Sequence, residues 1–246
     1  MIRLSIAAVA CALASAMPAD AAEVTLICSN ALKSVLEEIG PQFERASGHK
    51  LRVEFGTTGP LKARIEKGET FDVAILGVGA TDALVKQGTL ATATRIDIAR
   101  SGMGVAIRRG AAKPDIGTVD TLKRTLLNAK SIAYNNTGIT GTYLKGLFQR
   151  LGIADELKSK SVNGRGAEMV GEGKAELGLT QISEILPVKG AELLGPLPAG
   201  VQEYTVFPGA VASTSKEPDA AKALLKFLVS PDAAKAIRAH GLEPAA

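Results

Sequence analysis

Three short segments rich in hydroxyl, amide and glycine residues each follow a stretch that we expect to be a β-strand. They are Ser29-Asn30, Thr57-Thr58-Gly59 and residues 135–142, and none contains a carboxylate. Where such a segment opens a helix, the unpaired N–H groups and the partial positive charge of the helix N-terminus attract anions. Hydroxyl groups and glycine-exposed N–H groups add neutral donors. The three segments together favour a site for a small anion.

The same residue types have an ordinary structural role, because Ser, Thr and Asn are common helix caps and turn residues. Each segment taken alone is more readily explained as a plain cap. Pro60 suits a first helical position, with Thr58 or Gly59 as the cap before it. Because none of the three segments contains Asp or Glu, we favour anion binding over the purely structural explanation.

One arginine stands in a glycine-rich turn, Asn163-Gly164-Arg165-Gly166, ahead of an expected helix. A guanidinium can form a bidentate pair with a carboxylate or an oxyanion. Charged side chains are mostly exposed, so a solvated surface Arg165 is the commoner case. The lone acid Asp72 lies in an apolar strand, where a structural hydrogen bond is the ordinary explanation.

Motifs for nucleotide binding, zinc hydrolysis and nucleophilic catalysis are absent from the sequence. The only histidines, His49 and His240, are far apart and expected at the surface. We therefore expect no metal, no cofactor and no catalytic residue. The net charge of +4 is scattered, which predicts no nucleic-acid partner.

The N-terminus predicts export. Met1-Ile2-Arg3 is positive, residues 4–17 are apolar and small, and Ala19-Asp20-Ala21 fits a cleavage site. We expect residues 1–21 to be a signal peptide and the mature protein to be periplasmic. A lipid-bearing Cys11 is disfavoured because apolar sequence continues past it. Only Cys28 then remains, so no internal disulfide forms, and burial as a small apolar residue is its expected role.

Strand and helix patterns alternate along the chain, which predicts an α/β fold with mostly parallel sheets flanked by helices. We expect strands at 24–28, 51–55, 71–76, 103–108, 131–134 and 176–180, and helices at about 32–43, 61–67, 81–86, 119–128, 142–151, 218–229 and 231–240. The two last helices have apolar faces that need a sheet. We therefore expect one lobe from residues 22–100 plus 208–246, an inserted second lobe from 101–207, and a hinged cleft between them.

Several motifs in order resemble the periplasmic molybdate-binding family of type II solute-binding proteins, over nearly the whole mature chain. They are Ser29-Asn30-Ala31, Phe55-Gly56-Thr57-Thr58-Gly59-Pro60-Leu61, Phe71-Asp72-Val73-Ala74-Ile75, Phe227-Leu228-Val229-Ser230-Pro231-Asp232-Ala233-Ala234 and His240-Gly241-Leu242. The resemblance implies a two-lobed type II periplasmic-binding-protein fold and a tetrahedral oxyanion held by neutral donors. It also implies a monomer that serves the membrane permease of an ABC transporter.

By matching position, the resemblance places Ser29 and Thr58 on the first lobe's side of the ligand and residues around Thr140, Asn163 and Gln181 on the second. The chain departs from the family at Gln181, where a tyrosine is usual, at Ile139-Thr140-Gly141, where a proline-containing turn is usual, and at Thr57-Thr58-Gly59, where serines are typical. The expected ligand-binding residues are Ser29, Asn30, Thr57, Thr58, Gly59, Thr140, Asn163, Arg165 and Gln181.

Two alternatives to an oxyanion carrier stay open. Arg165 and the departure at Gln181 leave room for a binder of small carboxylic acids. Relatives of the family include an isomerase acting on a tricarboxylate, and such a reaction needs a positioned base. The candidate bases in this chain are Asp72, Glu168, Glu184 and Tyr143.

Overall fold

The computed structural model describes residues 21–245. The predicted signal peptide, apart from Ala21, and Cys11 lie outside the described residues. Within the described part of the chain, no helix combines the length and the apolar character needed to cross a membrane.

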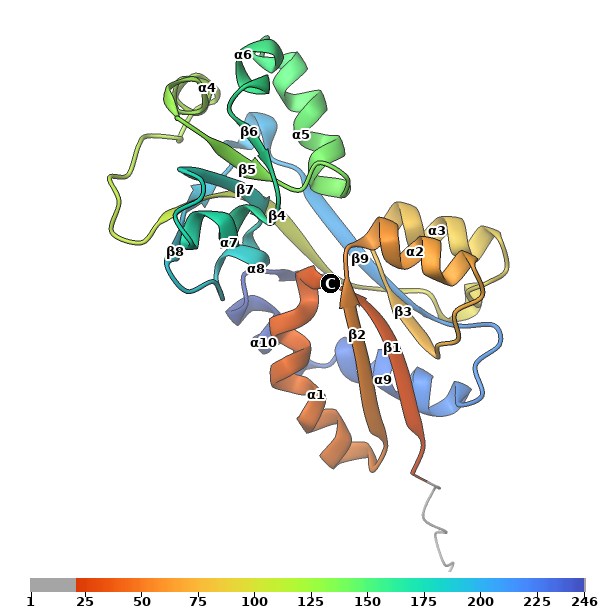
Figure 1. Ribbon diagram of the computed structural model, residues 1–246. Helices are drawn as coiled ribbons and strands as arrows, with labels where there is room; N and C mark the ends of the chain where they lie inside the picture. The colour runs from red at the N-terminus through yellow and green to blue at the C-terminus, as the bar shows by residue number, and fades with distance from the viewer. Residues whose placement is uncertain (1–20, 246) are drawn as a thin grey trace, which may run out of the picture.

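One lobe is built on three parallel strands, with β1 (Glu23–Ser29) between β2 (Lys50–Gly56) and β3 (Val73–Ile75). Side chains along β1 alternate between two cores. Leu26 and Cys28 pack on one face with α1 (Lys33–Ser47), α9 (Pro218–Leu228) and α10 (Pro231–Ala239). Ile27 packs on the other face with α2 (Thr58–Glu66) and α3 (Val78–Lys86). Figure 1 shows these two helices on the opposite side of the sheet from α1, α9 and α10. This period of two is what a strand covered on both faces requires.

The other lobe has β5 (Ile132–Tyr134) in parallel pairing with β6 (Ser161–Asn163) and β7 (Leu177–Gln181). β8 (Ala191–Pro196) and part of β4 (Ile96–Arg108) extend this sheet in antiparallel pairing. The helices are α4 (Val119–Asn128), α5 (Ile139–Arg150), α6 (Ala154–Lys158), α7 (Gly166–Gly171) and α8 (Ile182–Ile185). A separate apolar core, including Leu122, Leu126 and Leu144, fills this lobe.

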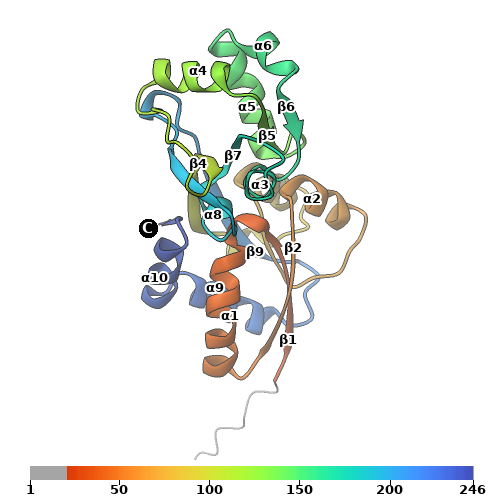
Figure 2. The same ribbon diagram turned by 60° about the vertical axis from the view of Figure 1, so that its left-hand side comes forward.

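Two long strands run between the lobes, as Figures 1 and 2 show. The first part of β4 pairs with β9 (Tyr204–Val211), and its second part, from Met103, pairs with β7. Every antiparallel pair among the described strands involves β4 or β9. The lobes are therefore joined by continuous strands.

The predicted fold class is confirmed, since both lobes are sheets flanked by helices. The lobe boundaries at 100/101 and 207/208 stay predictions. The helix predicted at 119–128 has those bounds in the structure. β4 begins at Ile96, earlier than predicted, because charged residues break its apolar pattern. The cap of α2 is Thr57, so the prediction of Thr58 or Gly59 as cap was wrong, and Pro60 lies inside the first turn.

Cys28 has no exposed surface, and burial raises the pKa of its thiol far above the usual range. Because the thiolate is the nucleophile, a buried and protonated Cys28 is unreactive. This agrees with its expected role as a small apolar residue.

Candidate functional site

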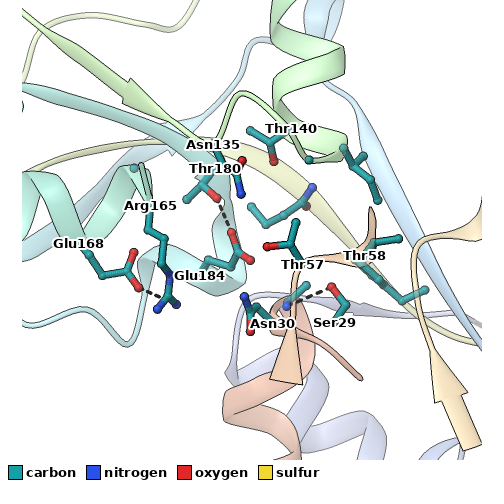
Figure 3. A pocket seen from close by; sticks show the side chains of 17 residues that line it. Ser29, Asn30, Thr57, Thr58, Asn135, Thr140, Arg165, Glu168, Thr180 and Glu184 are labelled. Atoms are coloured by element: carbon teal, nitrogen blue, oxygen red, sulfur yellow. Dashed lines mark hydrogen bonds and ion pairs between the residues drawn. The ribbon is translucent and has the colours of Figure 1, made fainter. Parts of the chain in front are cut away.

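A cavity of about 60 Å³ lies between the lobes, where the strands of both lobes end and helices begin (Figure 3). Since roughly 10–15 Å³ on this measure suffices for one water molecule, the cavity accepts a small anion. The lining residues are Ser29, Asn30, Ala31, Gly56, Thr57, Thr58, Asn135, Gly138, Ile139, Thr140, Arg165, Gly166, Glu168, Thr180, Gln181, Glu184 and Phe207.

The wall on the side of the first lobe comes from the ends of β1 and β2. Ser29 caps the short 3-10 helix Asn30–Leu32, with Oγ accepting from the N–H of Ala31 at 3.5 Å. Thr58 is buried, and its Oγ1 accepts from the N–H of Gly77 at 3.2 Å. Thr57 is the N-cap of α2, yet its side chain makes no capping bond. The Thr57 hydroxyl and the first N–H groups of α2 are therefore left for a ligand.

The wall on the side of the second lobe comes from the loop after β5 and the start of α5. Asn135 Oδ1 accepts from the N–H and the hydroxyl of Thr137, at 3.0 and 2.8 Å. The NH₂ group of Asn135 therefore points away from Thr137, and these hydrogen bonds leave its two N–H donors free. Gly138 caps α5 without a side chain, so the first N–H groups of α5 also lack a side-chain acceptor.

Gly141 explains why the loop after β5 can lie so close to α5. A Cβ at this position would stand 2.5 Å from the carbonyl oxygen of Asn135 and from the backbone of Asn136. Only glycine permits that approach, because the obstructing atoms are backbone and cannot rotate away. The glycine therefore holds Asn135 at the cavity.

Gln181 is buried at the end of β7 and lines the cavity. Its Nε2 donates to Thr205 Oγ1 at 3.1 Å, and its Oε1 has no partner among the described residues. With the amide reversed end for end, Thr205 donates to Oε1 and the NH₂ group takes the unpartnered place. Either orientation leaves one polar end for a bound molecule, since buried polar groups are nearly always hydrogen-bonded.

Three charged side chains line the cavity: Arg165, Glu168 and Glu184. Arg165 Nη2 pairs with Glu168 Oε1 at 2.6 Å. The Thr180 hydroxyl donates to Glu184 Oε2. Burial raises the pKa of Glu184 above the usual range of glutamate, while the Thr180 hydrogen bond and the charge of Arg165 act in the opposite direction and Glu168 adds to the rise.

Seven of the nine residues expected at the ligand line this cavity, and their ligand contacts stay predictions. They are Ser29, Asn30, Thr57, Thr58, Thr140, Arg165 and Gln181. Gly59 instead lines a neighbouring groove between the lobes, because α2 begins at Thr58 and turns Gly59 outward. Asn163 is exposed and does not line the cavity. Its Oδ1 accepts from the N–H of Asn136 at 3.1 Å, so it braces the loop after β5.

The candidate bases separate into two groups. Asp72 lies at the opposite end of β3, where its carboxylate accepts from the Thr25 N–H at 2.9 Å and the Ser215 hydroxyl at 2.7 Å. The hydroxyl of Tyr143 donates to the carbonyl of Val201. Glu168 and Glu184 line the cavity and remain available for chemistry there.

The expected binding set omitted several lining residues, of which Asn135, Thr180 and Glu184 are the most consequential. Thr180 and Glu184 are four residues apart across the end of β7, a spacing that brings side chains together once the chain turns into a helix. That helix, α8, has 4 residues, too few for a periodic pattern. The available signal was a pair of polar residues, Thr180 and Gln181, at the end of an apolar strand, with Ser183 and Glu184 close behind.

Comparison with known proteins gives consistent matches over nearly the whole chain. The family described as bacterial extracellular solute-binding protein matches residues 24–243. An aconitate isomerase from a Pseudomonas species is 36% identical over 231 residues, covering 90% of this chain and 87% of that protein. The molybdate-binding protein of Azotobacter vinelandii is 29% identical over 235 residues, covering 92% of each.

Solved structures share the fold at low sequence identity. The periplasmic molybdate-binding protein of Azotobacter vinelandii aligns with a TM-score of 0.75 at 20% identity, covering 89% of this chain and 98% of that one. The sulfate-binding protein of Mycobacterium tuberculosis also gives a TM-score of 0.75, at 16% identity, covering 91% and 87%. The two-lobed arrangement is thus that of known periplasmic binding proteins.

Proposed function

The chain belongs to the family of bacterial extracellular solute-binding proteins, and from that premise we propose that it captures a small oxyanion of the molybdate, tungstate or sulfate type between its lobes. The observation that carries the proposal is the set of neutral donors converging on the cavity. Thr57 and Asn135 offer a hydroxyl and an amide NH₂, and α2 and α5 begin at the cavity without side-chain caps. Oriented dipoles of this kind hold an anion without a neutralising cation.

The route of the bound anion follows from the expected export of the chain. The protein binds its ligand in the periplasm and delivers it to the membrane permease of an ABC transporter. It acts as a monomer, with residues 22–100 and 208–246 in one lobe and 101–207 in the other. Relatives named as molybdate-binding proteins support this role.

A thermal-shift panel on the mature chain tests the proposal. A ligand that binds only the folded state stabilises it by about 2.7 kcal/mol at a hundredfold excess over Kd, and this raises the melting temperature. We expect a shift with molybdate, tungstate or sulfate, and a smaller one in the Thr57→Val variant. No shift with any of the three oxyanions would contradict the proposal.

One observation favours a second candidate function. Glu184 places a carboxyl inside the cavity, burial raises its pKa, and a base works best when its pKa is near the operating pH. The similarity to an aconitate isomerase points to the same chemistry. In such a reaction Glu184 would take a proton from the methylene carbon, the double bond would shift by one position, and the proton would return to the former vinylic carbon.

The second candidate is tested by proton NMR of cis-aconitate incubated with the protein in D₂O. Isomerisation predicts loss of the cis signal and deuterium at the exchanged carbon, abolished in Glu184→Gln and retained in Glu168→Gln. Replacement of Arg165 by Ala should weaken binding of the substrate, because a guanidinium pairs with carboxylates. An unchanged spectrum with the unmodified protein rules this reaction out.

A further inference from the structure

The cavity contains an acid that an anion site does not need. Arg165 and Glu168 neutralise each other through their ion pair, which leaves Glu184 as the charged group without an ionic partner among the lining residues. An ionised Glu184 beside a dianion would repel it strongly, since the interaction of two charges grows as the surroundings lose water. A protonated Glu184 would carry no charge and would add one more donor.

We propose that Glu184 is a ligand-contacting residue of this site, which receives the anion as a protonated acid, so that each anion enters the cleft together with one proton. This inference rests on the proposed capture of an oxyanion. It names what sets the affinity at that site, and the isomerase reaction is not needed for it.

The geometry provides for both states of the carboxyl. Oε2 accepts from the Thr180 hydroxyl, and Oε1 has no hydrogen-bond partner among the described residues. Figure 3 shows Asn30, Thr57, Asn135 and Arg165 around this carboxyl, and all four line the cavity. A proton on Oε1 can therefore be donated to the anion while Oε2 keeps its bond to Thr180.

The surroundings of α8 favour the protonated state. Burial of the carboxyl is the largest effect and raises the pKa of Glu184, the Thr180 hydrogen bond and the charge of Arg165 lower it by less, and the nearby Glu168 adds a small further rise. The helix packs against α7, the 3-10 helix after β1, β4, β7 and β8. On the strands β4, β7 and β8 the titratable residues are Asp97, Arg100, Arg108 and Glu192, and none of these four lines the cavity. The 3-10 helix has none.

The linkage between proton and anion has a definite sign. Above the pKa of Glu184 in the free protein, the anion must bind together with a proton, so affinity falls by about tenfold per pH unit for one coupled proton. Below that pKa the acid is already protonated and affinity is constant. By reciprocity, the bound anion raises the pKa of Glu184 by the corresponding amount.

Isothermal titration calorimetry with sulfate, molybdate and tungstate tests the inference, in buffers of different ionisation enthalpy. The pH runs from about 5 to about 10, so that the range extends well above the ordinary pKa of glutamate and covers a raised one. We expect constant affinity below the raised pKa of Glu184 and, above it, uptake of about one proton per anion with the corresponding decline in affinity. Glu184→Gln should bind with a pH-independent Kd and take up no proton. Glu172→Gln is the control, which removes an exposed acid just after α7, outside the cavity, and should keep the proton uptake.

The possible outcomes separate this inference from the proposed function. Binding without proton uptake, or equal pH dependence in the unmodified protein and Glu184→Gln, overturns the role of Glu184 alone. No binding of any of the three oxyanions, by either protein at any pH, overturns the proposed function and this inference with it. Circular dichroism of each variant establishes that it is folded before titration.

Discussion

Gly77 and Ile139 lie in direct contact across the cleft, and a methyl group on Gly77 would overlap the Cδ1 atom of Ile139. Gly77 precedes α3 in one lobe, and Ile139 opens α5 in the other. Ile139 also lines the cavity. Because Ile139 both contacts the opposite lobe and lines the cavity, a change in how closely the lobes approach also changes the shape of the cavity.

Gly77→Ala should weaken anion binding, because the added methyl must displace Ile139 or hold the lobes apart. Because the obstructing atom ends a side chain that can rotate, the cost is that of an unfavourable rotamer, about 0.5–1.5 kcal/mol, or roughly two- to tenfold in Kd if the closed state bears it. The φ angle of Gly77 is −59°, so alanine causes no backbone strain there. The measurement is the Kd for tungstate by calorimetry.

The control for this substitution lies two residues along the chain. Gly79 is inside α3, and a Cβ there would meet nothing within 4 Å. Gly79→Ala should leave Kd unchanged and stabilise the helix by up to about 1 kcal/mol. Equal Kd values for the two variants would show that the Gly77 contact has no part in closure.

Thr57 offers a hydroxyl that has no capping task, and its removal should reduce affinity directly. Thr57→Val keeps the shape and deletes the donor. A hydrogen bond to a charged group contributes about 1.5–3 kcal/mol, so Kd should rise roughly ten- to hundredfold. Thr57→Ser should bind nearly as well as the unmodified protein. Unfolding in urea should be unchanged by either substitution, which separates this effect from misfolding.

Thr58 differs from its neighbour because its Oγ1 accepts from the buried N–H of Gly77 at 3.2 Å. Thr58→Val leaves that N–H unsatisfied, which costs about 1–3 kcal/mol of unfolding free energy. Thr58→Ser, which keeps the acceptor, should restore most of the loss. Urea denaturation of the three proteins measures it, and a fully stable Thr58→Val protein would show that water replaces the hydroxyl.

The junctions after strands could be predicted from the sequence because their signals are local. The apolar run before Ser29 and the helical pattern after it place that residue at a strand end, where the structure has it. The same reasoning placed Thr57 and Thr140 at one cleft. The order of strands and helices along the chain also predicted that the last two helices, α9 and α10, pack on the sheet of the first lobe, as they do.

The acid in the cleft and the contact across it depend on tertiary structure. Glu184 reaches the cavity through α8, a single turn that follows β7 and shows no periodicity. Asn163 carries the same polar signal as Asn135, and only the pairing of β6 with β5 decides that Asn163 braces the loop while Asn135 faces the cavity. The approach of Gly77 to Ile139 joins residues of different lobes, which no local pattern specifies.

Asp72 is structural, and its removal should lower stability without affecting binding. Its carboxylate joins β1 and the loop before α9 by accepting from the Thr25 N–H and the Ser215 hydroxyl. Asp72→Ala leaves both donors unpaired and should cost about 1–3 kcal/mol in urea denaturation. Asp82, whose side chain is 54% exposed in its pair with Arg95, is the control, and Asp82→Ala should cost no more than about 1 kcal/mol. A change in anion Kd for Asp72→Ala would contradict the structural role.

The pH dependence of stability supplies an independent measure of Glu184 in the absence of ligand. Because burial raises its pKa, the folded state keeps a proton that the unfolded state releases. The contribution of Glu184 to the free energy of unfolding is therefore fully present below about pH 4.3, the ordinary pKa of glutamate. It is lost as pH rises through the raised pKa of Glu184 in the folded protein. Glu184→Gln removes this term, so its unfolding free energy should exceed that of the unmodified protein by an amount that grows with pH.

Urea denaturation of both proteins at a series of pH values measures that difference. Titrating groups far from Glu184 affect both proteins alike, so the difference reports on Glu184 and on its coupling to Arg165 and Glu168. The Thr180 hydrogen bond is kept in the variant, because the glutamine amide can accept from that hydroxyl through its carbonyl oxygen. A difference that shrinks as pH rises would mean that the cleft stabilises the ionised carboxylate, and the proton-linked capture of anions would then lose its physical basis.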